Sequence, residues 1–146
     1  MLKSRKLILT TILIVVVGMV SVSVYMFMTS DPINDAYALL GASEMLISYM
    51  ESHQGAWPRT WDELLPQFKQ NNGRVAGWSF ERFQSRVAVD FDSDPEKLRQ
   101  ASLSSPVATF EVIRPKHLLA AQMGSGPNQV LCDYFRQKPA PPRPKR

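Results

Sequence analysis

The feature that most constrains this chain is an uncharged, apolar stretch near its N-terminus, from Leu7 to Met28. It holds 22 residues and no proline, so as an α-helix it would be roughly 33 Å long. A bilayer core is about 30 Å thick, and a backbone inside it must satisfy its own hydrogen bonds. The stretch therefore predicts a transmembrane helix, with Leu7, Gly18, Tyr25, Phe27 and Met28 as its membrane-anchor residues.

The charges around this stretch predict its direction. Lys3, Arg5 and Lys6 precede it, whereas no basic residue follows it until Arg59. Because basic residues tend to stay in the cytoplasm, the N-terminus is predicted there and the rest outside. A cleaved signal peptide is the alternative, but the apolar run is longer than such peptides use and bulky residues fill positions 25–28. We therefore expect an uncleaved, single-pass signal-anchor protein of the plasma (inner) membrane, with the lipid bilayer as a partner.

Composition divides the chain into parts and limits what they bind. The expected parts are a cytoplasmic N-terminus at 1–6, the transmembrane helix at 7–28, an extracytoplasmic α+β domain at 29–136 and a disordered, Pro-rich basic tail at 137–146. The formal net charge of +4 comes from the two ends, because all 13 acidic but only ten of the 17 basic residues lie in 7–137. Such a domain is not expected to bind nucleic acid.

Patterns after the apolar stretch predict helices first and strands later. Apolar spacing favours a helix over 33–53, nearly continuous with the preceding one through Pro32. Thr60 and Glu63 form a capping box for a short helix that ends near Pro66. Further elements follow: strands at 75–83, 85–91, 107–113 and 129–135, a short helix at 94–101 capped by Asp94, and a helical turn at 117–122. This order predicts an α+β fold, with the long amphipathic helix packed on a small antiparallel sheet.

The passage after the long helix resembles the type IV pilin-like group, in particular the pseudopilins of type II secretion. The residues that carry the resemblance are Tyr49, His53, Gly55, Trp57-Pro58 and Trp61-Asp62-Glu63-Leu64. In that group a tyrosine, a glycine, an aromatic-proline pair and a short leucine-bearing helix link the long helix to the sheet. The resemblance covers residues 7–65 and implies a pilin-like architecture.

The processing signal of that group is missing from this sequence. Pilin-like precursors carry a glycine directly before the apolar stretch and a glutamate five positions after the cut. No glycine precedes Leu7, and Gly18 is followed by Met19, with Ser23 at the glutamate position. The sequence therefore predicts a pilin-like architecture on an uncleaved anchor.

Two features suggest an interaction surface, and each has a simpler alternative. Trp57, Trp61 and Trp78 are the predicted interaction residues, although three tryptophans in a small domain also stabilise a core and its edge. The tail contains overlapping P-x-x-P patterns within 139–144, which either dock in an aromatic groove or remain solvated.

Motifs for catalysis or metal binding are weak. Three aspartates spaced two apart in 90–94 match the start of an EF-hand loop, but Pro95 stands in its glycine position. A strand end followed by a helix cap is therefore expected. His53 and His117 lack the spacing of a metal site, and Cys132 is expected in the core. The sequence predicts no catalytic residue, metal or cofactor.

The expected function is that of a membrane-anchored, non-enzymatic protein with a pilin-like interaction domain, accessory to a secretion or envelope complex. Its partners would be proteins or further copies of itself. The alternative is a stand-alone anchored α+β domain that binds a small ligand or a cell-wall component. An enzyme would instead bring polar side chains together in a deep pocket.

Overall fold

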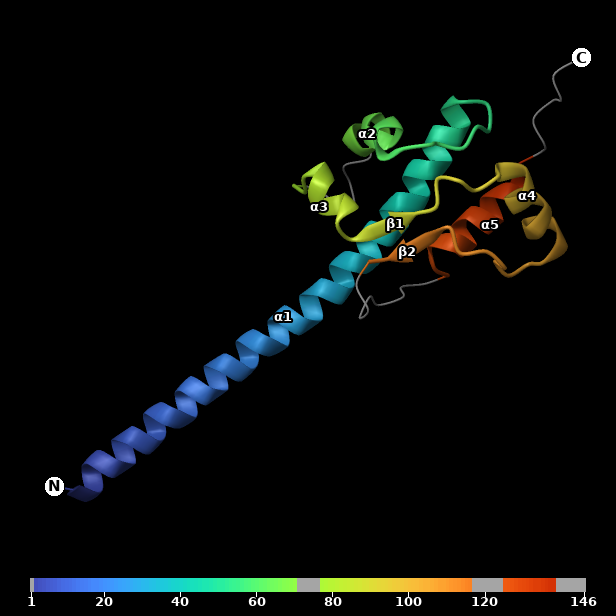
Figure 1. Cartoon of the computed structure of the whole chain (residues 1–146). Coiled ribbons are helices and arrows are strands. Elements are labelled where there is room, and N and C mark those ends of the chain that lie inside the picture. The colour runs from blue at the N-terminus through green and yellow to red at the C-terminus, as the bar shows by residue number, and fades with distance from the viewer. Residues whose placement is uncertain (1, 71–76, 117–124, 139–146) are drawn as a thin grey trace, which may run out of the picture.

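A single long helix dominates the molecule. The computed structural model describes residues 2–70, 77–116 and 125–138, except for the side chains of residues 2–10, 13 and 25–31. Helix α1 (Leu2–Ser52) has 51 residues and continues through Pro32, which confirms the predicted continuity. Its N-terminal half projects from the molecule, and its C-terminal part runs through the domain (Figure 1).

The prediction of a transmembrane helix at 7–28 is contradicted. A crossing helix needs roughly 20 consecutive apolar residues. Among the described residues, no helix is both long and apolar enough to cross a bilayer. In this part of α1, the side chains are described without a gap over residues 14–24. The predicted fold class with a membrane-spanning helix, the single-pass signal-anchor topology and the inner-membrane localisation are therefore wrong.

The rest of the domain surrounds the C-terminal part of α1. Its elements are α2 (Trp61–Gln70), α3 (Phe80–Gln84), β1 (Val87–Val89), α4 (Pro95–Ser104), β2 (Ile113–Pro115) and α5 (Pro127–Gln137). Helices α2 and α3 lie on one side of α1, and α4 and α5 lie on the other (Figure 1). Helix α1 contacts α2, α5 and both strands, while α4 packs on α5. The described chain is thus an α+β domain with α1 at its centre.

One hydrophobic core follows the C-terminal part of α1. That helix buries one broad face, with Ala38, Leu39, Ala42, Met45, Leu46, Tyr49 and Met50 in the core. Small residues let neighbours approach closely: the Phe83 ring lies 3.4 Å from the place where a Gly41 Cβ would be. Phe83 of α3 and Leu131 and Phe135 of α5 close the core from the two sides and are almost completely buried.

The sheet is smaller than the sequence predicts. Strands β1 and β2 pair antiparallel, with Val87 opposite Pro115 and Val89 opposite Ile113. The predicted strand at 85–91 is reduced to β1, and the one at 107–113 meets the sheet only at its last residue. Side chains of α5 replace the missing strand partners: Asn128 Oδ1 accepts from the Val112 and Ile113 amides, both at 3.0 Å. Amides held in this way do not need a neighbouring strand.

Two predicted strands are helices instead. Residues 80–84 form α3 and overlap the end of the predicted strand at 75–83, because the Ser79 side chain caps the first turn of this helix by accepting from the Arg82 amide. The predicted strand at 129–135 lies inside α5, where Leu131, Cys132 and Phe135 share a buried face at helical spacing. Helix α2 also runs past Pro66 to Gln70.

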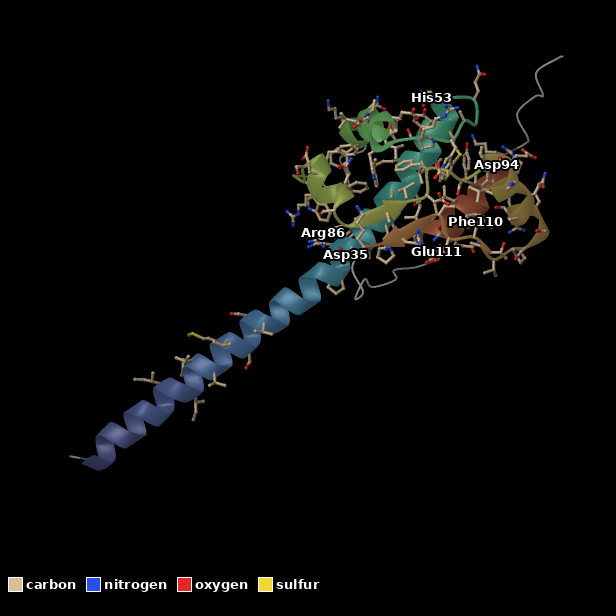
Figure 2. All side chains as sticks on the ribbon, viewed as in Figure 1. Asp35, His53, Arg86, Asp94, Phe110 and Glu111 are labelled. Carbon is tan, nitrogen blue, oxygen red and sulfur yellow. The ribbon has the colours of Figure 1, made fainter. Side chains whose placement is uncertain are left out.

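A buried ion pair fixes the start of the sheet to α1. Arg86 Nη1 lies 2.6 Å from Asp35 Oδ1, and the two side chains are 13 % and 3 % exposed. Figure 2 shows both residues where α1 enters the domain. The Arg86 guanidinium also lies over the Trp78 ring, 5.3 Å from its centroid. The pair therefore joins residues 51 positions apart in the chain.

Candidate functional site

A hollow of about 370 Å³ lies at the end of the domain away from the projecting half of α1. It is open to solvent and is lined by Tyr49, Ala56, Trp57, Arg59, Glu63, Phe91, Ser93 and Pro95. These residues come from the last turns of α1, the loop after it, the first turn of α2 and the segment that runs from the end of β1 to the first residue of α4. Figure 2 shows His53 and Asp94 at this end of the domain.

The aromatic wall of the hollow is held by contacts between distant segments. The Trp57 indole N–H donates to the Asp90 carbonyl oxygen at 2.9 Å, which ties the loop after α1 to the segment after β1. Trp61 meets the Phe91 ring edge-on, with 5.4 Å between centroids. Pro95 adds an apolar surface, because it begins α4 directly after the Asp94 cap. Trp57 is buried while Phe91 is half-buried, so the wall is both fixed and accessible.

The polar side of the hollow is built around the Glu63 carboxylate. Tyr49 Oη donates to Glu63 Oε2 at 2.8 Å, and the Arg59 amide donates to the same oxygen at 2.9 Å. The His53 ring stacks on the Tyr49 ring, with 4.0 Å between centroids. Because both of these hydrogen bonds end on Oε2, the orientation of the carboxylate is set while Oε1 remains an acceptor for a ligand.

The pKa values of these two groups shift in opposite directions. The hydrogen bond from the Arg59 amide, followed by that from Tyr49, lowers the pKa of Glu63 below its ordinary value of 4.5. Burial, followed by the hydrogen bond to Glu63, raises the pKa of Tyr49 above 10.0. At neutral pH the hollow therefore holds a carboxylate and a neutral phenol.

Two of the segments that line the hollow are rich in acidic residues. Asp62 lies beside Glu63 in the first turn of α2, and Asp90, Asp92, Asp94 and Glu96 follow β1. Asp90 accepts from the Asp92 amide and the Ser93 hydroxyl, and Asp94 caps α4 through the Glu96 amide. These aspartates thus form a turn directly after the end of β1 and the expected helix cap. Their negative charge lies in the same segments as Glu63, Phe91 and Ser93, which line the hollow, and it attracts cations.

The structure separates the three predicted interaction tryptophans. Trp57 lines the hollow. Trp61 lies behind the wall and packs against Phe80, Phe83 and Phe91. Trp78 is half-buried under the guanidinium groups of Arg82 and Arg86. No contact that the structure describes brings Trp78 to the hollow, so the three side chains do not form one surface.

The other predicted residues lie elsewhere. Gly18 is in the projecting part of α1, and a Cβ added there would meet nothing within 4 Å. Leu7, Tyr25, Phe27 and Met28 belong to α1, but their side chains lie outside the described residues. His53 follows the last turn of α1, as predicted, and His117 lies outside the described residues. Cys132 is buried in α5, and no group of three metal-ligating side chains occurs in the described ranges.

Sequence reasoning missed the combination of Tyr49, Glu63 and Phe91. Glu63 was interpreted as half of a capping box with Thr60, whereas its carboxylate bonds the Arg59 amide, one residue earlier. The spacing of Thr60 and Glu63 therefore indicated the start of a helix correctly, although the carboxylate bonds a different amide. The bond from Tyr49, 14 residues away, depends on how the loop between α1 and α2 folds back.

Loss of the Glu63 charge is expected to change the acid stability of the domain. A lowered folded-state pKa means that Glu63 stabilises the fold above its unfolded pKa, and that this contribution disappears as the pH falls through the folded value. A Glu63→Gln variant should therefore lose less of its thermal stability than the wild type between pH 6 and about pH 3. Melting temperatures followed by circular dichroism measure this, and identical pH profiles would contradict it. Glu111→Gln, at an exposed position away from the hollow, is the control.

No protein-family model, curated protein or solved structure compared with the chain matches it.

Proposed function

We propose that this is a non-enzymatic interaction protein, and that the hollow beside Glu63 binds an extended, cationic segment of a partner protein. The observation that carries the proposal is an ionised carboxylate held against an aromatic and proline wall. A lysine or arginine side chain suits both surfaces, because its head pairs with a carboxylate and with aromatic faces while its stem covers apolar atoms.

The size and openness of the hollow favour a peptide over a small molecule. A volume of about 370 Å³ is near the lower limit for pockets that enclose a small ligand. An extended segment needs only one or two side chains to enter, while its backbone passes over the rim. The acidic residues of 90–96 support the same choice, because their charge attracts cations to the segment that also carries Phe91 and Ser93.

The titrating groups support binding rather than catalysis. A general acid or base works best with a pKa close to the working pH. Here the pKa of Glu63 moves down and that of Tyr49 moves up, so both move away from neutrality. Recognition of a cation instead requires a carboxylate that stays ionised and keeps one orientation.

We also propose that the domain is pilin-like, and its layout supports this. The C-terminal part of one long helix forms the centre of the domain and packs against both strands of an antiparallel pair. The Tyr49, Trp57 and Glu63 positions that carry the resemblance lie together in the hollow. In this proposal, the passage that resembles the pseudopilins is also the surface that meets the partner.

Calorimetric titration with a capped peptide tests the proposal. The probe is acetyl-Pro-Ala-Pro-Pro-Arg-Pro-Lys-Arg-amide, with a version carrying glutamine at its three cationic positions as the negative control. We expect binding by the full chain, weakened about tenfold by Glu63→Gln, as for the loss of one charge-assisted hydrogen bond. Phe91→Ala should weaken it similarly, by removing the aromatic wall.

Matched variants separate the hollow from the rest of the surface. Phe110→Ala removes another half-buried phenylalanine, and Glu111→Gln removes another exposed carboxylate; Figure 2 shows both away from the hollow. Both should bind like the wild type. Equal binding of the glutamine peptide, or equal loss in the matched variants, would overturn the proposal. Tight binding of free arginine would instead favour a small cationic ligand.

A further inference from the structure

We propose that the partner segment enters this hollow with a trimethylated lysine, whose quaternary ammonium group binds against the aromatic rings. This inference rests on the proposed function and narrows its ligand from cations in general to one chemical class. The observation that carries it is the lining itself: Tyr49, Trp57, Phe91 and Pro95 share one hollow with the Glu63 carboxylate. Aromatic rings beside an anionic group are well suited to recognise quaternary ammonium ions.

The aromatic residues of the lining come from three segments, and each ring is fixed by a contact of its own. The Tyr49 hydroxyl donates to the carboxylate at 2.8 Å, and the Trp57 indole donates to the Asp90 carbonyl oxygen at 2.9 Å. Phe91 packs against Trp61, with 5.4 Å between ring centroids. A ligand therefore meets rings whose positions are already set, so little entropy is lost in ordering them.

Phe91 provides the largest share of accessible ring. Tyr49 and Trp57 are each only 8 % exposed, whereas Phe91 is half-buried. A cation that enters the hollow therefore meets the Phe91 ring and the neighbouring proline, Pro95, on its apolar side. Phe91 is accordingly the residue at which ring recognition can be tested.

The apolar side of the hollow disfavours the ammonium group of an ordinary lysine. That group is compact and strongly hydrated, and it carries three N–H donors. The side chains of Phe91 and Pro95 contain no acceptor, and the indole of Trp57 is a donor only. An N–H group that turns towards them loses its water without replacement, which costs free energy. A trimethylammonium group has the same charge but no N–H, so it packs its methyl groups there without that loss.

Arg59 also lines the hollow, and its charge favours the methylated ligand further. Its side chain is exposed, and its charge interacts with that of Glu63. The positive charge of Arg59 thus offsets part of the attraction that Glu63 exerts on any cation. A primary ammonium, which relies on pairing with the carboxylate, loses more by this than a quaternary ammonium, which also draws on the rings.

Calorimetric titration of the full chain with three matched peptides tests the inference. The parent is acetyl-Pro-Ala-Pro-Pro-Gln-Pro-Lys-Gln-amide, in which lysine is the single cation. The second peptide carries trimethyllysine at that position, and the third carries a neutral side chain of the same shape that ends in a tert-butyl group. The trimethyllysine peptide should bind about tenfold more tightly than either of the others.

The variant Phe91→Leu separates the ring from its apolar volume. Leucine keeps an apolar wall but has no aromatic face, so the preference for trimethyllysine over lysine should fall from about tenfold to about twofold. Phe110→Leu, at another half-buried phenylalanine away from the hollow, is the control and should keep the full preference. A preference that Phe91→Leu leaves unchanged would overturn recognition by the rings.

The remaining outcomes distinguish this inference from the proposed function. Equal affinity for the lysine and trimethyllysine peptides would overturn the inference and leave the proposed function intact. Equal affinity for the trimethyllysine and neutral peptides would overturn it as well, because the hollow would then distinguish shape only. Free choline that binds as tightly as the trimethyllysine peptide would replace the protein segment with a small ligand. Absence of binding by all probes, the arginine-containing peptide included, would overturn the proposed function and the inference with it.

Discussion

Replacement of Arg86 by methionine is expected to lower the free energy of unfolding by about 3–5 kcal/mol, the usual cost of leaving one partner of a buried ion pair alone. Asp35 is only 3 % exposed, and the Arg86 guanidinium lies 2.6 Å from its carboxylate. Methionine keeps much of the apolar stem but removes the charge. Urea unfolding followed by tryptophan fluorescence measures the loss.

Two further variants identify the buried pair as the cause. Arg82→Met removes a guanidinium that also lies over Trp78, at 4.7 Å, but is exposed, so its cost should stay below about 1 kcal/mol. The double variant Asp35→Leu/Arg86→Met should recover most of the lost stability, because it leaves no charge buried. Equal costs for Arg86→Met and Arg82→Met would show that the pair contributes little.

Truncation of Phe83 is the second large effect, with an expected cost of about 3–5 kcal/mol for Phe83→Ala. The side chain is fully buried between α1 and α2. Its ring lies 5.4 Å from that of Phe68 and 6.0 Å from that of Trp61, measured between centroids. Helix α1 cannot move in to fill the space, because it is fixed to the rest of the core on its other faces.

The matched control for this truncation lies on the same short helix. Phe80→Ala removes a half-buried ring, so thermal or urea unfolding should show a clearly smaller loss. Peptide binding provides a second readout: Phe83→Ala should also weaken it, because Trp61 packs against both Phe83 and Phe91. A loss no larger than that of Phe80→Ala would mean that the core collapses into the cavity.

Local signals in the sequence predicted those parts of the fold that depend on neighbouring residues. Continuity of α1 through Pro32 and the cap of α4 by Asp94 are confirmed, because spacing and capping act within a few residues. The strand at 129–135 was wrong, since a short apolar run fits a buried strand and a helix face equally well. Gly126 and Pro127 were the signal for a helix start there.

The sheet and the site depended on contacts that no local pattern contains. Asn128 satisfies the amides of Val112 and Ile113, so the strand predicted at 107–113 loses its need for a partner. The hollow likewise depends on the bond from Tyr49 to Glu63 and on the bond from Trp57 to the Asp90 carbonyl. The membrane-spanning helix was predicted from the length of one uncharged apolar run and the charges before it, and the described residues contradict it.

The unbroken course of α1 has a mechanical consequence. Tyr49, which orients Glu63, belongs to the same hydrogen-bonded rod as Leu2, and about 70 Å separate them at 1.5 Å per residue. A force or torque applied to the projecting part reaches the hollow without crossing a loop. The Asp35–Arg86 ion pair holds α1 where it enters the domain, so it would act as the pivot about which a displacement of the projecting part moves the end of α1 that lines the hollow.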